Sequence, residues 1–229
     1  MDYKDYGLTY TVGSHMYGLT TPDSDIDLLT VYFDPGDYIR PYREHPEVKE
    51  SHGNNVKLYS LDYFAKLIVK GNPNLVEVVK LTPDFTGPKD TAVKDFMELL
   101  AGGHEMVHQG VAKAYMGHLT SIIKELDTKG VTPKRLSHAL RVCYSVDHIL
   151  KHQTLFTLRD EPEKRLDCLL IKRETNPSFL KGHEGYVRNH IFEVETTYHR
   201  LIGTMPDNSK VRELINSFFQ DQYSYSYYS

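Results

Sequence analysis

The sequence predicts an α/β (α+β) protein in which a small mixed sheet with flanking helices is followed by an α-helical domain. Two stretches before residue 34 have strand character, and in the first of them apolar and polar residues alternate, whereas helical spacing dominates after about residue 90. Two prolines and a glycine between Pro83 and Pro88 mark a boundary between these parts. We therefore expect a core domain over residues 1–88, a helical domain over 89–219, and a disordered polar tail over 220–229.

Each expected element follows from a short stretch of sequence. Strands are predicted over residues 8–12, just before Gly13, and over residues 26–33. Residues 58–69 are predicted to form a helix, because their apolar side chains recur at helical spacing. Further amphipathic helices are predicted near residues 105–126, 134–152, 184–203 and 208–219.

Composition restricts the class of protein. The 229 residues are 40% apolar, which suffices for an ordinary buried core, and they include no apolar run long enough to span a membrane. The first residues carry acids and lack the pattern of a secretory signal, so a soluble cytoplasmic protein without a membrane partner is expected. Cys143 and Cys168 form no CxxC pair and indicate neither a disulfide framework nor a cysteine zinc site.

Charge is unevenly distributed along the chain, whose net charge is −4. Residues 1–100 contain 10 Lys and Arg against 16 Asp and Glu, while the remainder carries a small excess of basic residues. The front half is therefore suited to binding cations, and the back half tolerates a phosphate-bearing partner.

A Gly-Ser pair after the first strand is followed, about ten residues later, by two alternating aspartates. Gly13 and Ser14 are expected to open a short helix whose free N–H groups and hydroxyl hold phosphate oxygens. Asp25 and Asp27 flank Ile26, so on a strand both carboxylates project from one face while the isoleucine enters the core. Two adjacent carboxylates form a site for a hard cation such as Mg²⁺, which keeps waters and substrate phosphates as its other ligands.

The stretch GSHMYGLTTPDSDIDL is similar to the signature of nucleotidyltransferases of the DNA polymerase beta superfamily, and its full length resembles their predicted RNA-repair-associated branch. LYSLDYF, the NPN element at residues 72–74 with Glu77, and the segment from Pro133 to Arg141 resemble later elements of that branch. Together these motifs cover most of residues 8–175. The resemblance implies a nucleotidyltransferase-type sheet, a nucleoside triphosphate substrate, and Mg²⁺ (or Mn²⁺) as cofactor.

The implied reaction is attack of an acceptor hydroxyl on the α-phosphate, with loss of pyrophosphate. An RNA end is the acceptor that the resemblance favours, and a protein hydroxyl is chemically equivalent. The resemblance assigns Gly13 and Ser14 to the triphosphate, and Asp25 and Asp27 to the metal ions. The identity of the nucleotide and the oligomeric state stay open.

Asn55 departs from the pattern of this family. The family places a third carboxylate on a strand just before the LYSLDYF-type helix, and alignment puts Asn55 at that position. An asparagine carbonyl ligates a metal weakly and cannot accept a proton as a carboxylate does. Either a nearby acid such as Glu50 or Asp62 substitutes, or the alignment is displaced, or the protein binds nucleotide without efficient transfer.

Basic residues recur on one face of the helix expected over residues 134–152. Lys134, His138 and Arg141 follow helical spacing on the face opposite an apolar stripe. A solvated face of a packed helix explains this pattern equally well. The resemblance favours the functional alternative, in which these three side chains contact triphosphate or a polynucleotide backbone.

The pentad from His104 to His108 matches HExxH, which on a helix binds zinc through both histidines and uses the glutamate as general base. A zinc metalloprotease would also need a third ligand, for which His118 or Glu125 are candidates. A further alternative is a nucleotide-binding module of the nucleotidyltransferase fold that has lost turnover, and Asn55 is its main support.

Overall fold

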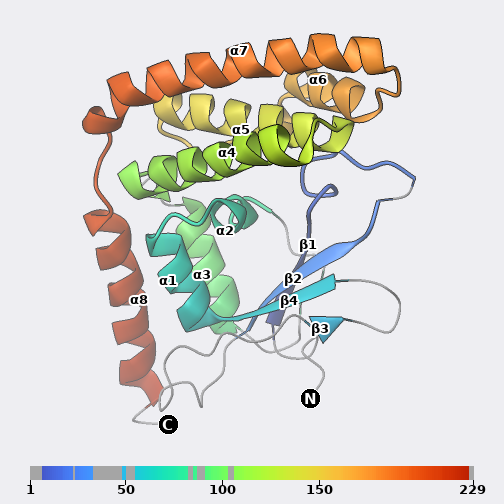
Figure 1. Cartoon of the computed structure of the whole chain (residues 1–229). Helices are drawn as coiled ribbons and strands as arrows, with labels where there is room; N and C mark the ends of the chain where they lie inside the picture. Colours follow the sequence, from blue (N-terminus) through green and yellow to red (C-terminus); the bar gives the residue numbers. More distant parts are fainter. Residues whose placement is uncertain are drawn as a thin grey trace.

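The computed structural model describes residues 7–22, 24–32, 48–49, 55–81, 85–86, 91–102 and 106–226. It has two parts, a twisted sheet with its own helices and a layer of long helices stacked on one side of it (Figure 1). One hydrophobic core runs through both parts. The predicted α/β class with a helical second half is confirmed.

The sheet has five strands in the order β3-β4-β2-β1-β5. Their bounds are β1 Gly7–Val12, β2 Asp27–Tyr32, β3 Val48–Lys49, β4 Asn55–Ser60 and β5 Phe85–Thr86. β1 and β2 are antiparallel, whereas β2 and β4 are parallel, so the sheet is mixed as predicted. The register pairs Asp27 with Val12 on one side and with Asn55 on the other.

Two short helices, α1 (Leu61–Val69) and α2 (Pro73–Val78), follow β4. The helix predicted from residue 58 begins three residues later, because residues 58–60 belong to β4 and the Ser60 hydroxyl caps α1 by accepting from the Tyr63 N–H. Gly71 ends α1 at φ 74°, a conformation that favours glycine. A Cβ on Gly71 would lie 2.5 Å from the Val111 backbone nitrogen, so α1 and the next layer approach closely at this point.

The helical layer consists of α4 (Gln109–Lys129), α5 (Pro133–His152), α6 (Pro162–Lys172) and α7 (Pro177–Leu201). α5 is its centre and packs against the other three helices. Pro133 starts α5 at a position where its missing N–H costs nothing, and the Thr132 hydroxyl caps the first turn.

Two further helices belong to the sheet side of the molecule. α3 (Thr91–Gly102) packs against β1, and α8 (Ser209–Ser226) runs down the side of the molecule to α1 and α3 (Figure 1). Residues 220–226 were expected to be disordered, and instead they continue α8, because each residue added to an existing helix costs far less than nucleating one. The domain boundary near residue 88 stays a prediction.

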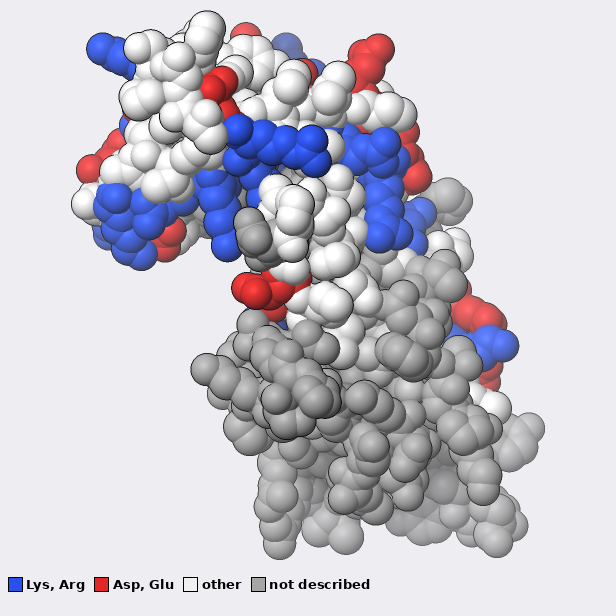
Figure 2. All heavy atoms as spheres, turned by 90° about the vertical axis from the view of Figure 1, so that its right-hand side faces the viewer, with Lys and Arg blue, Asp and Glu red and all other residues white. Residues whose placement is uncertain are grey.

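None of the helices among the described residues is both long and apolar enough to cross a membrane. Lysine and arginine side chains gather on one face of the helical layer (Figure 2). This face is on the side where α4 ends and where α5 and α7 begin (Figure 1).

Candidate active site

An open cavity of about 400 Å³ lies between the loop after β1, strands β2 and β4, and helices α2, α5 and α6. Its lining is mixed, and both the sheet and the helices contribute apolar as well as polar or charged residues. The lining residues are Val12, Gly13, Ser14, Met16, Tyr17, Leu19, Asp27, Leu28, Leu29, Lys57, Tyr59, Asn72, Asn74, Leu75, Lys134, Ser137, His138, Arg141 and Lys172.

The Gly13–Gly18 segment forms one corner of this cavity. It was expected to open a short helix, but it forms a single turn that ends at Gly18. Gly18 donates to the His15 carbonyl at 3.1 Å, Leu19 donates to the Ser14 carbonyl at 2.9 Å, and Gly18 has φ 66°. These are the two bonds and the left-handed glycine of a Schellman motif, which stops helical winding after one turn.

Gly13 lies directly against the carboxylate of Asp27. A Cβ built on Gly13 would stand 2.4 Å from Asp27 Oδ2, closer than real side chains approach, and Gly13 has φ 63°. The approach follows from the register, since Val12 pairs with Asp27 across β1 and β2. The turn that begins at Gly13 and one of the two aspartates are therefore adjacent in space.

Asp25 and Ile26 do not follow the predicted alternation. β2 begins at Asp27, so Asp25 and Ile26 precede the strand, and Ile26 is 42% exposed instead of entering the core. Side chains alternate between the two faces only where the strands are paired, and the pairing of β1 with β2 starts at Val12 and Asp27. Asp25 is exposed and is outside the lining of the cavity.

Asn55 starts β4 and pairs with Asp27 in a parallel register. Backbone pairing thus puts Asn55 beside the aspartate, as the alignment of the third carboxylate position required, although its side chain is outside the described residues. Lys57 and Tyr59 follow on β4, and both line the cavity. Of the two acids considered as substitutes, Glu50 is outside the described residues, and Asp62 is on α1 and does not line the cavity.

The predicted basic face of α5 reaches the cavity through Lys134, His138 and Arg141. His138 Nε2 lies 3.3 Å from Nε2 of His118 on α4, so one imidazole donates and the other accepts. Burial, with Arg141, His118 and Lys134 nearby, lowers the pKa of His138 to about 3. His138 is therefore a neutral side chain at neutral pH and not a cation in this cavity.

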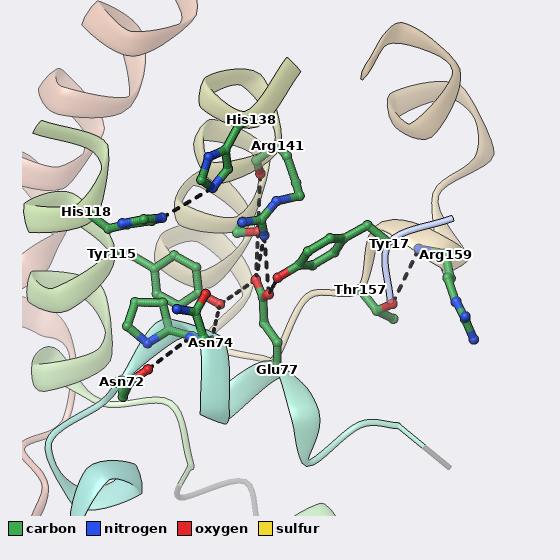
Figure 3. Close-up of polar contacts among 12 residues, drawn as sticks. Tyr17, Asn72, Asn74, Glu77, Tyr115, His118, His138, Arg141, Thr157 and Arg159 are labelled. Atoms are coloured by element: carbon green, nitrogen blue, oxygen red, sulfur yellow. Dashed lines mark hydrogen bonds and ion pairs between the residues drawn. The ribbon is translucent and has the colours of Figure 1, made fainter. Parts of the chain in front are cut away.

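Arg141 is committed to a buried network around Glu77 (Figure 3). Its Nη1 lies 3.2 Å from Glu77 Oε2, and both side chains are 5% exposed. The same carboxylate accepts hydrogen bonds from Tyr17, from Tyr115 at 2.6 Å and from Ser145 at 3.3 Å. Burial raises the pKa of both tyrosines, which keeps their hydroxyls protonated as donors.

The Glu77 network joins four parts of the chain. Glu77 is on α2, Tyr115 on α4, and Arg141 and Ser145 on α5, while Tyr17 belongs to the turn beside Gly13. The Arg141 guanidinium carbon lies 3.8 Å from the centre of the Tyr17 ring. The sequence hypothesis that Glu77 only complements a helix terminus missed this role, because the donors are 38 to 68 residues away in the chain.

Lys172 is a cavity residue that sequence reasoning did not find. It ends α6, and its Nζ donates to Ser14 Oγ at 3.1 Å and to the Leu19 carbonyl. Both partners belong to the turn at the start of the chain, more than 150 residues away. No local motif marks this lysine, since a basic residue in the last turn of a helix is common.

Two arginines hold the outer side of the same turn. Arg159 Nη2 donates to the His15 carbonyl at 2.8 Å, and Arg165 packs against Gly18, where a Cβ would lie 3.1 Å from Arg165 Cδ. The turn is therefore fixed by contacts from the 3-10 helix η4 (Leu158–Asp160) and from α6, as well as by its own backbone.

The described part of the HExxH pentad is not α-helical. His104 and Glu105 are outside the described residues, and His108 precedes α4 as its N-cap. The His108 Nδ1 accepts a hydrogen bond from the Gly110 N–H at 3.0 Å, so this nitrogen is not available to zinc. The arrangement does not reproduce the helical histidine pair on which the protease hypothesis depended.

The residues at the Gly13–Gly18 corner of the cavity are suited to a hard divalent cation that needs few protein ligands. Asp27 brings a carboxylate to the Gly13–Gly18 turn, and Asp25 is two residues away in the chain. Within the described ranges, no group of three or more His, Cys, Asp or Glu side chains could hold a metal ion. Mg²⁺ commonly takes one or two carboxylates and completes its shell with water and substrate phosphates.

A comparison with protein-family models matches residues 8–221 to the RNA repair pathway DNA polymerase beta family, RlaP. The chain belongs to this family. The match spans the sheet, the cavity and most of α8, so the RlaP family includes both parts of the molecule. The resemblance suspected from the GSHMYGLTTPDSDIDL stretch is confirmed.

Among curated proteins, the RlaP chain is similar to an uncharacterized 38.9 kDa protein of the nrdC-mobD intergenic region of Enterobacteria phage T4. The two are 26% identical over 140 residues, which is 57% of this chain and 41% of the phage protein. The similarity thus spans less than half of that relative.

Proposed function

We propose that this RlaP-family protein is a nucleotidyltransferase that transfers a nucleoside monophosphate from a triphosphate to an acceptor hydroxyl. The contact of Gly13 with Asp27 is the observation that carries the proposal, because it joins a phosphate-holding turn to a carboxylate. Lys57, Lys134 and Lys172 border the same cavity and complement a polyphosphate. A 400 Å³ cavity is within the size range of small-ligand sites.

In this reaction the acceptor oxygen forms a bond to the α-phosphorus, the bond to the bridging oxygen breaks, and pyrophosphate leaves. Ser14 and the backbone N–H groups of its turn hold phosphate oxygens, and the cavity excludes bulk water from them. Asp25 and Asp27 would hold Mg²⁺ or Mn²⁺, which supplies charge stabilisation for the attacking and leaving oxygens. Catalysis by the protein is then chiefly positioning and electrostatics.

The acceptor we favour is an RNA end, in keeping with the description of the family as part of an RNA repair pathway. The test is incubation of the purified protein with each labelled nucleoside triphosphate and Mg²⁺ or Mn²⁺, with and without RNA. We expect label on RNA with the parent protein and none with Asp27→Asn. Label on the protein alone would identify a protein hydroxyl as acceptor, and no label with any triphosphate would contradict transfer.

Asn55→Asp tests the third carboxylate position directly. Because the backbone pairs this residue with Asp27, an added carboxylate there should hold a cation more tightly and accept the proton of the attacking hydroxyl. We expect label transfer to rise about tenfold or more, a gain typical of a positioned general base. An unchanged rate would show that another acid serves this role.

A catalytically weakened nucleotide-binding module of the same fold is the second candidate, and the neutral Asn55 favours it. The two candidates differ in one measurement. Binding of a triphosphate by the parent without label transfer, together with transfer by Asn55→Asp, would identify the weakened module.

A further inference from the structure

Apart from Lys57 on β4, the cations at the cavity fall into two groups. Arg141 is neutralised by Glu77 at 3.2 Å and is almost fully buried. Lys134 and Lys172, in contrast, form no ion pair with any acid of the described residues, and neither does the adjacent Arg173. Of these two groups, only the second has positive charge left for a ligand.

Lys172 is held in place while retaining a free donor. Its ammonium group has three N–H bonds, of which two are directed to Ser14 and Leu19. The group is half-buried at the corner where the Gly13–Gly18 turn is expected to hold phosphate. A phosphate oxygen bound by Ser14 would therefore meet this ammonium as well.

The surroundings of Lys172 are electropositive. Burial lowers the pKa of Lys172, and the charges of Lys134 and Arg173 lower it further. Like charges this close repel each other, so an anion placed among them would relieve the repulsion. Lys134 adds a position in the first turn of α5, where the helix dipole is positive.

We propose that Lys172 and Lys134 bind the two terminal phosphates of the nucleoside triphosphate and so select triphosphates over monophosphates. This inference rests on the proposed function, because it assigns the binding of the terminal phosphates to residues of the same cavity. Arg141 is not a phosphate ligand in this arrangement. It is a positioning residue that holds Tyr17, and through Tyr17 the turn beside Gly13.

Inorganic tripolyphosphate is the probe, because it carries the phosphate chain without a base or a sugar. Its binding to the full chain is measured by titration calorimetry in the presence of Mg²⁺, beside a nucleoside monophosphate. We expect Lys172→Met and Lys134→Met each to weaken tripolyphosphate binding about tenfold or more, as the loss of one charged hydrogen bond predicts. Binding of the monophosphate should change much less.

Three further variants make the test specific. Lys172→Arg keeps the charge and should retain most of the affinity. Lys210→Met removes an exposed lysine from α8, away from the cavity, and should change nothing. Lys134 is exposed, makes no hydrogen bond through its side chain among the described residues, and so can be replaced without disturbing the fold.

The inference is overturned if Lys134→Met and Lys172→Met bind tripolyphosphate as the parent does, or if the parent does not bind it. Its failure differs from failure of the proposed function. Label transfer that persists in both variants with unchanged triphosphate affinity would remove the inference and keep the transferase. Lysine-dependent tripolyphosphate binding without any label transfer would keep the inference and remove the transferase.

Discussion

Arg141 shows how burial decides what a charged side chain is available to do. Its place on the basic face of a helix suggested a phosphate ligand, but its guanidinium is paired with Glu77 inside the molecule. The two buried charges compensate each other, and further donors hold the carboxylate in place. Removal of either partner alone leaves an uncompensated charge inside the molecule. The packing of the sheet part against the helical layer therefore depends on Glu77.

Glu77→Gln is expected to destabilise the protein by about 3 kcal/mol, the cost of leaving a buried charge without its partner. The substitution keeps the shape of the side chain and removes only the charge that compensates Arg141. Urea unfolding of parent and variant measures the difference. The double variant Glu77→Gln with Arg141→Met should recover part of the loss, and a single variant as stable as the parent would contradict the argument.

His138 makes stability depend on pH in one direction. Burial lowers its pKa from 6.5 to about 3, with Arg141, His118 and Lys134 adding to the effect. Below pH 6.5 the unfolded chain takes up a proton that the folded chain excludes, so the free energy of unfolding falls as the pH falls toward 3. Above pH 6.5 this residue has no such effect.

The measurement is the urea midpoint of parent and His138→Gln at several pH values between 7 and 4. The variant should lose less stability than the parent as the solution is acidified. His118 faces the same space and its pKa is also lowered, chiefly by burial, so the double variant should flatten the pH dependence further. Parallel curves for parent and His138→Gln would show that the imidazole is not buried in solution.

At the scale of elements, α8 links the end of the chain to the sheet side. The ring of Phe218 packs edge-on to that of Phe96, with ring centres 5.0 Å apart, and Phe96 on α3 is fully buried. α8 therefore completes the core of the first part of the molecule, although it follows the helical layer in sequence.

Phe218→Ala should destabilise the protein by about 2 kcal/mol, less than the loss for a fully buried phenylalanine. The thermal midpoint reports the change. Phe192→Ala is the matched control, because Phe192 is 71% exposed on α7 and its removal leaves no cavity. Equal midpoints for the two variants would mean that α8 does not pack on α3.

α6, which the sequence pattern missed, is a helix whose apolar residues do not all face the core. α6 exposes Leu166 and Leu170 at 54% and 57%, which blurs its apolar stripe. α5, predicted at residues 134–152, has a continuous buried face and was found almost to the residue. Periodicity reports burial, so it identifies a helix only to the extent that packing follows the stripe.

At the scale of the whole molecule, the cavity lies between two parts that both contribute charged residues to its lining. Gly13 and Asp27 come from the sheet part, and Lys134 and Lys172 from the helical layer. A triphosphate that contacts both halves would bind only the folded chain and would resist their separation.

We expect a nucleoside triphosphate with Mg²⁺, at about 100 times its dissociation constant, to stabilise the folded chain by about 2.7 kcal/mol. The thermal midpoint should then rise by roughly 5 to 10 °C for a chain of this size. The corresponding monophosphate at the same concentration should give a smaller shift. A shift that is equal for both nucleotides would show that the terminal phosphates are not held.

The family, the α/β class and the Gly13, Ser14 and Asp27 corner were accessible from the sequence, because they depend on local spacing in one motif. The convergence of Lys172 on Ser14 and of four donors on Glu77 was decided by the tertiary structure alone. Local periodicity specifies which face of an element is buried. It carries no information about which distant side chain meets that face, since this depends on how complete elements pack.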